Sequence, residues 1–204
     1  RRQRQMCIRD RFASDVKLIY SGEFTIKVAT TEENVTDNYL SSDDVINVYI
    51  SGIDSRGGIN EVSRSDVNII MSINKKTHNI LMINTPRDYY VPLSISNGVR
   101  DKLTHAGVYG IECSRNTLEM LYGIQIDYYV KVNFSGFEKI IDSLGGVDVT
   151  LDYSATLSQA GNLTVHNGVN HFNGEQALAF ARERYAYSDG DRQRGRNQMM
   201  IMEA

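Results

Sequence analysis

The chain has 204 residues, and its hydrophobic fraction of 41% and charged fraction of 23% are those of an ordinary globular protein. Its formal net charge of −3 argues against general nucleic-acid binding, which favours a basic domain. The two cysteines, Cys7 and Cys113, provide neither a disulfide framework nor the spacing of a metal site. No apolar run approaches the roughly 20 residues that a membrane span needs.

The first 44 residues precede the predicted main domain. Residues 1–11, RRQRQMCIRDR, are basic and without periodicity, and we interpret them as a leader that is not native to the protein. Residues 12–44 contain one β-like piece, Phe24–Ala29, and then a polar run, which predicts a linker or the end of a truncated accessory domain. The main domain is expected over residues 45–204, with its C-terminus truncated within a helix.

Three apolar, β-branched runs open the main domain. We predict strands over Val45–Ser51, Val67–Ile73 and His78–Asn84, and the last two read as a hairpin around the sequence NKKT. Pro86 follows the third run and ends ladder pairing. Charged residues gather at the ends of these runs, which indicates a site on the rim of a sheet.

Helical and strand-like segments alternate in the following stretch. Helices are predicted over Thr104–Tyr109 and Ser114–Tyr122, and a strand over Ile126–Phe134. Ser135 is predicted to cap the next helix, FEKIIDSL, and Val147–Leu151 returns to strand. This strand–helix–strand succession predicts an α/β layered domain.

Two further helices are predicted near the C-terminus. Asn173 and Gln176 form a start signal for the helix GEQALAFARERY. The last helix is expected to begin near Asp191 and to continue to Ala204. In the middle of the chain, Cys113 has no partner histidine in a recognisable motif and is predicted to be a core residue.

A pair of aspartates at the strand ends is the first candidate site. Asp54 and Asp66 lie twelve residues apart, each beside an arginine. Two carboxylates suit a hard cation such as Mg²⁺, whose remaining positions a substrate phosphate can fill. The alternative is a pair of turn residues neutralised by Arg56 and Arg64, and taken alone this simpler interpretation is favoured.

Five arginines crowd into fifteen residues near the C-terminus and form the second candidate site: Arg182, Arg184, Arg192, Arg194 and Arg196. Arg194 and Gln198 are i,i+4 partners on one face of the predicted last helix. Guanidinium groups match phosphate oxygens in bidentate hydrogen bonds, so convergent arginines indicate a di- or polyphosphate ligand. A solvated helix face paired with Glu183, Asp189 and Asp191 is an equally good reading of the same residues.

An ordered set of motifs adds a family resemblance over residues 45–204. The set reads GIDSR, RSDVNIIMSI, INTPRD, DKLTHAG, FSGFEKIIDSLGGVDV, HFNGEQALAFARERY and finally D-x-x-R-x-x-x-Q at Asp191, Arg194 and Gln198. In this order the set resembles the LytR-CpsA-Psr family, and its residues are most similar to those of the CpsA branch of streptococcal capsule assembly.

The resemblance implies an α/β/α sandwich with a central mixed β-sheet and an apolar cavity for an isoprenoid tail. It also implies a membrane-anchored, extracytoplasmic phosphotransferase of bacteria with thick walls. Such an enzyme moves a capsular or teichoic-acid type glycan from a polyprenyl pyrophosphate carrier to peptidoglycan. Mg²⁺, with Mn²⁺ as an alternative, is the implied cofactor, and nucleic acid is not an implied partner.

The family pattern also implies site residues. Asp54 and Asp66 match the Mg²⁺-associated aspartates, and Lys102 matches a recurrent basic position of less certain role, which is expected at the pyrophosphate headgroup. The residues matching those around the pyrophosphate are Arg64, Arg87, Arg182, Arg184, Arg194 and Gln198. Of these, Arg64, Asp66, Arg87, Arg182 and Arg184 are expected to take part in the reaction, and the general base is left open between Asp66 and Asp88.

The sequence departs from the family pattern in two respects. No membrane helix precedes the motifs, so an anchor is expected in a missing N-terminal segment. Asn197 stands where many members have a second arginine before the terminal glutamine. Two rival functions stay open, namely a transcriptional attenuator and a polyprenyl-phosphate-binding protein or pyrophosphatase without transfer activity.

Overall fold

The computed structural model describes residues 24–28, 43–55, 58–59, 61–158, 162–188 and 190–204. The expected leader over residues 1–11 lies outside these ranges, as do Arg56 and Asp189. None of the helices in these ranges combines the length and the apolar character that crossing a membrane requires.

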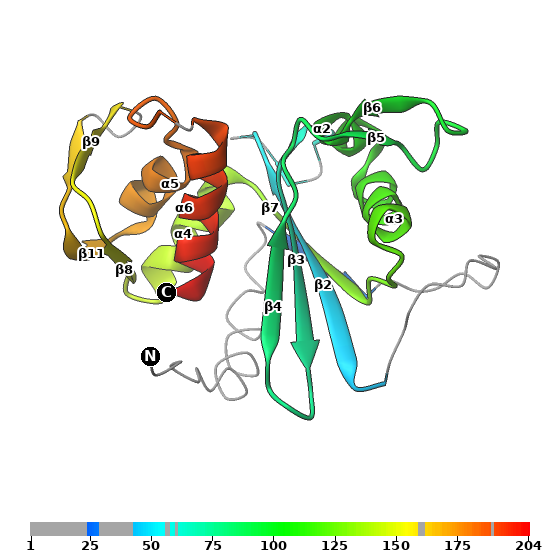
Figure 1. The fold of residues 1–204 in the computed structure, drawn as a ribbon, viewed down its shortest axis with the longest axis horizontal. Coiled ribbons are helices and arrows are strands. Elements are labelled where there is room, and N and C mark those ends of the chain that lie inside the picture. The colour runs from blue at the N-terminus through cyan, green and yellow to red at the C-terminus, as the bar shows by residue number, and fades with distance from the viewer. Residues whose placement is uncertain (1–23, 29–42, 56–57, 60, 159–161, 189) are drawn as a thin grey trace.

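A five-stranded mixed sheet forms the centre of the fold (Figure 1). Its strand order is β1-β7-β2-β3-β4, and only the β2–β7 pair is parallel among these neighbours. The strands are β1 (Phe24–Val28), β7 (Tyr128–Val132), β2 (Val45–Ile53), β3 (Ser65–Asn74) and β4 (Ile80–Asn84). The α/β class with a central mixed sheet, expected from the sequence, is thereby confirmed.

The hairpin predicted around NKKT is formed by β3 and β4. Its turn is closed by the side chain of Asn74, whose Oδ1 accepts the backbone N–H of Lys76 and of Thr77, each at 2.9 Å. An asparagine that hydrogen-bonds the backbone two and three residues ahead mimics a turn. His78, which leaves the turn with φ of 57°, completes the reversal.

Strand β1 comes from the segment before Val45 and pairs antiparallel with β7, from Phe24 opposite Val132 to Val28 opposite Tyr128. The β-like piece predicted there is therefore a strand of the central sheet. The boundary expected at Val45, between a linker and the main domain, stays a prediction.

One face of the sheet is covered by a short helical layer. It comprises α2 (Leu103–Ala106), the 3₁₀ turn η1 (Gly107–Tyr109) and α3 (Ile111–Tyr122), preceded by a ribbon of β5 (Tyr90–Pro92) and β6 (Arg100–Lys102). Tyr49 and Ile70 of the sheet pack in one hydrophobic cluster with Leu103, Leu118 and Cys113. Cys113 is buried, as predicted for a core residue.

The other side of the sheet faces a second layer, seen beside β4 in Figure 1. Its helices are α4 (Phe134–Ser143), α5 (Gly174–Arg182) and α6 (Asp191–Glu203). Its strands form two antiparallel ribbons, β8 (Val147–Leu151) with β11 (Gly168–Phe172) and β9 (Ala155–Leu157) with β10 (Leu163–Val165). The members of its hydrophobic cluster all lie between Phe137 and Ile201, so this layer has a core of its own.

Two helix starts test the predicted caps. The cap predicted at Ser135 is wrong, because α4 begins at Phe134 and Asn133 accepts the N–H of Gly136 at 2.9 Å. An extended asparagine placed three residues before that N–H satisfies it better than a serine already inside the helix. The start signal at Asn173 and Gln176 is confirmed as a capping box on α5.

Candidate functional site

Four strand ends meet at one rim of the central sheet. Ile53 at the end of β2 pairs with Ser65 at the start of β3, and Gly52 pairs with Val132 at the end of β7. The backbone N–H of Thr85, just after β4, donates to Asn68 of β3 at 2.8 Å. Asp54, Asp66 and Arg87 follow or begin these strands, so the rim placement predicted from the sequence is confirmed.

Asp66 and Arg87 form the central ion pair of this rim. Nη1 of Arg87 donates to both carboxylate oxygens of Asp66, at 3.0 and 2.9 Å, and Thr104 Oγ1 donates to the same carboxylate at 3.4 Å. Burial works to lower the pKa of Arg87, but Asp66 outweighs it, with help from Asp88 and Asp191, and leaves that pKa raised. Arg87 therefore stays a firmly protonated donor.

The Nε of Arg87 makes a longer contact with Asp88. This nitrogen is buried and has no hydrogen-bond partner among the described residues, although Asp88 Oδ2 lies at 3.5 Å as an ion pair. Buried donors are rarely left unsatisfied in proteins. The Nε of Arg87 therefore faces Asp88, and this contact contributes to the lowered pKa of that carboxyl.

Asp88 is engaged by Lys102 as well. Lys102 Nζ donates to Asp88 Oδ1 at 2.7 Å, and Asp88 is about half exposed. The hydrogen bond from Lys102 is the main cause of the lowered pKa of Asp88, which partial burial opposes. Lys102, expected near a phosphate, is thus tied to a carboxylate beside Arg87.

Arg194 reaches the same region from α6, although it is only 8% exposed. Its Nη2 contacts Asp191 Oδ1 at 2.7 Å. Burial lowers the pKa of Arg194, with the positive charges of Arg87 and Arg184 acting in the same direction, while Asp191 and Asp66 oppose the shift. The sheet rim and the α5–α6 segment therefore share one electrostatic environment.

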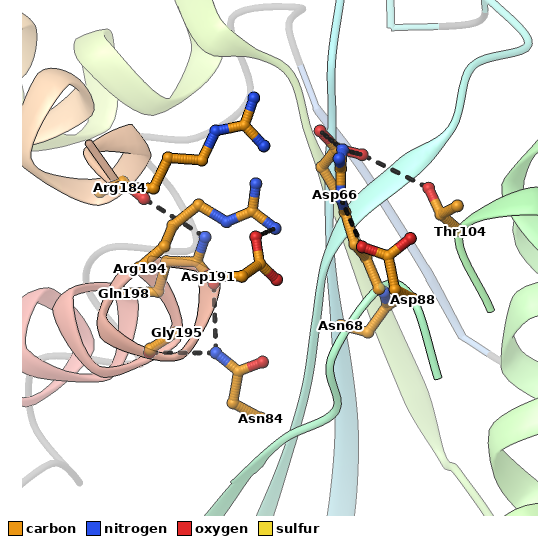
Figure 2. Close-up of polar contacts among 12 residues, drawn as sticks. Asp66, Asn68, Asn84, Asp88, Thr104, Arg184, Asp191, Arg194, Gly195 and Gln198 are labelled. Carbon is orange, nitrogen blue, oxygen red and sulfur yellow. Dashed lines mark hydrogen bonds and ion pairs between the residues drawn. The ribbon is translucent and has the colours of Figure 1, made fainter. Parts of the chain in front are cut away.

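Figure 2 shows how these groups face one another. The side chains of Arg184 and Arg194 extend from the helical side toward Asp66 on the sheet side. Arg184 Nη2 donates to the hydroxyl of Tyr185 at 3.1 Å. Because Arg194 is buried, the reading of this arginine cluster as a solvated helix face is wrong at that position.

Arg182 lies at the end of α5 and stacks on an aromatic ring. Its guanidinium carbon is 4.4 Å from the ring centre of Phe134, the first residue of α4 after β7. Since β7 ends at the rim shared with Asp54 and Asp66, this contact places Arg182 beside the same rim.

Gln198 connects three elements. Asn84 Nδ2, at the end of β4, donates to Gln198 Oε1 and to the carbonyl of Gly195, each at 3.1 Å. Gln198 Nε2 donates to the carbonyl of Ala181 in α5 at 3.3 Å. Both ends of the amide are thus used within the protein, and a headgroup contact of Gln198 stays a prediction.

Glu183 holds the loop between the two arginine positions. It is fully buried, and its Oε1 accepts the backbone N–H of Arg184, Tyr185 and Ala186 at 2.9, 2.7 and 3.1 Å. Ser158 Oγ donates to the same carboxylate at 3.2 Å. The sequence left a solvated position for Glu183 open as one of two interpretations, and its burial excludes that interpretation for this residue.

The expected metal ligands are less closely organised. Asp54 is exposed and its carbonyl accepts Ser63 Oγ at 3.2 Å, and Arg64 is exposed. In the described part of the chain, no cluster of three or more His, Cys, Asp or Glu side chains could hold a metal. Asp54 and Asp66 at one rim fit a cation only if ligand oxygens complete its coordination, which is the arrangement expected from the sequence.

An apolar sheet face lies behind the charged rim, on the side of α6. Asn84, which contacts α6, pairs with Ile69, and the same face carries the pairs Val48 with Met71 and Met71 with Met82. Val48, Ile69 and Met71 are buried, while Met82 is half-buried. These side chains belong to neither of the two clusters described above. The charged rim thus borders a largely buried apolar face of the sheet.

Other site residues were not found from the sequence. Thr104, which bonds Asp66, and Asn84, which joins β4 to α6, carry no local signal of these contacts. Asp191, in contrast, was named from the sequence as an acidic partner of the arginine cluster, and it forms an ion pair with Arg194 three residues later.

The fold is thus a central mixed sheet with helical layers beside it and arginines gathered near one rim. The chain belongs to the LytR_cpsA_psr family, whose sequence model matches residues 16–204. This confirms the family resemblance, whereas the finer assignment to the CpsA branch stays a prediction.

Two relatives and one solved structure show the similarity. The polyisoprenyl-teichoic acid–peptidoglycan teichoic acid transferase TagU of Bacillus cereus is 34% identical over 81% of this chain and 53% of its own length. TagT of Bacillus subtilis, with the same transferase name, is 33% identical over 90% and 59%. A TagT structure with bound octaprenyl pyrophosphate is similar with a TM-score of 0.67 and 30% identity, over 87% of this chain and 68% of that chain. The chain thus spans somewhat more than half the length of these two relatives.

Proposed function

We propose that this chain is the catalytic region of a phosphotransferase that moves a glycan polymer from a polyprenyl pyrophosphate carrier to peptidoglycan. The observation that carries the proposal is the convergence of three arginines: Arg87 bonds Asp66 at the rim, which borders an apolar sheet face, and Arg184 and Arg194 extend toward Asp66 from the helical side (Figure 2). A pyrophosphate attached to an isoprenoid has the same two-part character. The similar structure with bound octaprenyl pyrophosphate supports this assignment.

The reaction is a displacement at phosphorus. A sugar hydroxyl of peptidoglycan attacks the phosphorus that carries the glycan, and its oxygen forms the new P–O bond. The bond from this phosphorus to the bridging oxygen breaks, and polyprenyl phosphate leaves with the electron pair. Phosphoryl transfer depends mainly on alignment and charge stabilisation, so the protein's task is to place cationic donors around the phosphates.

The arginines divide that task. Arg87 is fixed in place by Asp66, which also keeps it protonated. Arg194 is desolvated, which strengthens its attraction for a phosphate oxygen. Arg184 approaches from the loop that Glu183 organises. Together these residues would neutralise charge on the non-bridging oxygens and on the leaving phosphate.

The proton of the attacking hydroxyl needs an acceptor. Asp88 has a lowered pKa because Lys102 bonds it, and a carboxylate that holds its charge so readily is a weak base. Asp66 is likewise hydrogen-bonded by Arg87 and by Thr104, so the general base stays open between Asp66 and Asp88.

Mg²⁺, or Mn²⁺ in its place, belongs to the proposal as a cofactor held by Asp54 and Asp66 together with substrate oxygens. When bound it would supply further charge neutralisation at the pyrophosphate. We further propose an envelope location on the extracytoplasmic face, with attachment to the membrane through a segment before the described domain. No nucleic acid is a proposed partner, in agreement with the net charge of −3.

The decisive experiment is transfer from a synthetic, water-soluble short-prenyl pyrophosphate disaccharide to peptidoglycan oligomers. Mass spectrometry should find the disaccharide joined to the oligomer through a phosphodiester, together with prenyl phosphate. Arg87→Ala should abolish this product, whereas Arg196→Ala, an exposed arginine on α6, should retain it.

The products also separate the rival functions. Disaccharide phosphate released to water, without joined product, would identify a pyrophosphatase. Binding of the substrate without any turnover would identify a lipid carrier. Either result would contradict the proposed transfer.

A further inference from the structure

The β5–β6 hairpin exposes an unusual number of apolar side chains. Within residues 89–100, Tyr89, Tyr90, Ile95 and Val99 are 51%, 60%, 54% and 69% exposed. The same segment contains no acidic residue and ends in the exposed Arg100. Exposed aliphatic and aromatic side chains gathered on one short hairpin mark an interaction surface.

The hairpin is a formed structure whose inner side is already used. Val91 and Leu93 are each 3% exposed and pack in the cluster under α3. Ser94 N–H donates to Thr117 Oγ1 of α3 at 3.0 Å. Because these residues hold the hairpin to the domain, Ile95 and Val99 at its tip are left to point away from the core.

The tip itself is closed by its own hydrogen bonds. The backbone N–H of Ser96 donates to Leu93 at 2.9 Å, and the N–H of Val99 donates to Ser96 at 3.1 Å. Asn97 and Gly98 take the positive φ values of 48° and 91° that such a reversal needs. The apolar tip is therefore organised in the free protein, which lowers the ordering cost of binding.

The base of the hairpin is hydrogen-bonded to the segment that carries Arg87 at the rim of the sheet. Leu103 N–H donates to the carbonyl of Tyr89, and Thr104 N–H donates to the carbonyl of Arg87, each at 2.8 Å. Tyr90 and Lys102 are paired across the ribbon, and Lys102 bonds Asp88 beside Arg87. Figure 1 shows the ribbon projecting above α3, at the edge of the domain. A partner that covers this surface would lie next to the carrier's headgroup.

We propose that the β5–β6 hairpin docks this domain on the surface of an anionic lipid bilayer. Ile95 and Val99 would enter the region between headgroups and acyl chains, Tyr90 would lie at the interface, and Arg100 would contact lipid phosphates. The inference rests on the proposed function, because a carrier whose tail resides in a bilayer must be collected at the bilayer surface. Aliphatic tips do not stack on sugars, so the observations favour lipid over a glycan strand.

Vesicle flotation tests the docking without any need for catalysis. The chain should float with vesicles of phosphatidylcholine and phosphatidylglycerol and bind vesicles of phosphatidylcholine alone less well. The double variant Ile95→Ser, Val99→Ser should weaken binding roughly tenfold or more, because each loses apolar transfer. Arg100→Ala should weaken binding to the anionic vesicles about fivefold. Val169→Ser is the matched control, since Val169 is 68% exposed on β11, and it should leave binding unchanged.

Tryptophan fluorescence tests whether the tip of the hairpin enters the bilayer. The chain has no tryptophan, so Val99→Trp and Val169→Trp each introduce a single reporter. Anionic vesicles should shift the emission of the first variant to shorter wavelength and leave that of the second unchanged. Equal behaviour of the two variants would overturn the proposal.

These experiments can distinguish a failure of the docking proposal from a failure of the proposed transfer function. The serine double variant should keep full transfer from the water-soluble short-prenyl substrate and lose transfer from carrier embedded in vesicles. Vesicle binding without transfer would contradict only the proposed function. Transfer of the soluble substrate by a chain that does not bind vesicles would defeat only the docking proposal. The hairpin could instead bind peptidoglycan fragments and no vesicles. That result would identify the surface as a glycan site and would also overturn the docking proposal.

Discussion

Arg87 donates a single guanidinium nitrogen to both carboxylate oxygens of Asp66, at 3.0 and 2.9 Å. The contact joins the start of β3 to the segment after β4, and it leaves the Nε of Arg87 facing Asp88 Oδ2 at 3.5 Å. Asp66 thus has two consequences for the site. It keeps Arg87 charged and oriented, and it is one of the two carboxylates proposed as the general base.

Asp66→Asn should lower transfer roughly 100-fold, because the site loses the anion that orients Arg87 and one of the two proposed Mg²⁺ ligands. Folding should survive, since Asp66 is only partly buried at a strand end. Asp54→Asn should instead weaken Mg²⁺ binding. This variant should need a higher Mg²⁺ concentration, and its transfer rate should recover when Mg²⁺ is saturating. Rates measured over a Mg²⁺ series test both. Two variants with wild-type rates at limiting Mg²⁺ would rule out the paired-aspartate site.

Arg87→Lys retains the charge but removes the fork and the buried Nε donor. We expect a loss of about 100-fold in transfer, comparable with removal of one preorganised donor to developing charge. The matched control is Arg196→Lys, at an exposed arginine whose Nη1 donates to Gln193 of its own helix. Similar losses in the two variants would indicate a diffuse basic surface instead of a specific headgroup site.

Glu183→Gln should destabilise the fold by about 1–3 kcal/mol, since the oxygen that accepts three backbone N–H groups loses the negative charge that strengthens these hydrogen bonds. Chemical denaturation measures the free energy of unfolding. Glu175→Gln, in the first turn of the same helix and exposed, should change it little. An unchanged stability of Glu183→Gln would show that the loop holding Arg184 does not depend on this carboxylate.

Asn133→Ala should cost about 1 kcal/mol of stability, the usual effect of removing a helix N-cap. Ser135→Ala should cost much less, because Ser135 lies inside α4 rather than at its cap. The ratio of the two losses in the same denaturation assay decides between the cap seen in the structure and the one predicted from the sequence.

Lys102→Gln should raise the pKa of the Asp88 carboxyl, because the hydrogen bond from Lys102 is the main cause of its lowered value. A carboxyl whose folded pKa is lowered adds stability above its unfolded pKa and loses it as pH falls through the folded pKa. In the variant, the acid loss of stability at Asp88 should therefore shrink. An NMR titration of Asp88 follows the pKa, and an unchanged value would contradict the assigned ion pair.

Local signals in the sequence determined the elements. The capping box at Asn173 and Gln176, the i,i+4 spacing of Arg194 and Gln198 and the turn at NKKT involve residues within four positions of one another. Their physical basis is contained in single turns of helix or hairpin, so no tertiary information was needed. The family motifs likewise lie in order along the chain, which identified the class before the fold was known.

Only the tertiary structure decided which charged groups meet. Asp66 forms its ion pair with Arg87, twenty-one residues away, although Arg64 is closer to it in sequence. The same packing buries Arg194 and Glu183, which both allowed a solvated-face reading in the sequence. A charged helix residue has the same sequence pattern whether its side chain is exposed or buried. Its desolvation depends on which elements pack against the helix, and the helix sequence does not contain that information.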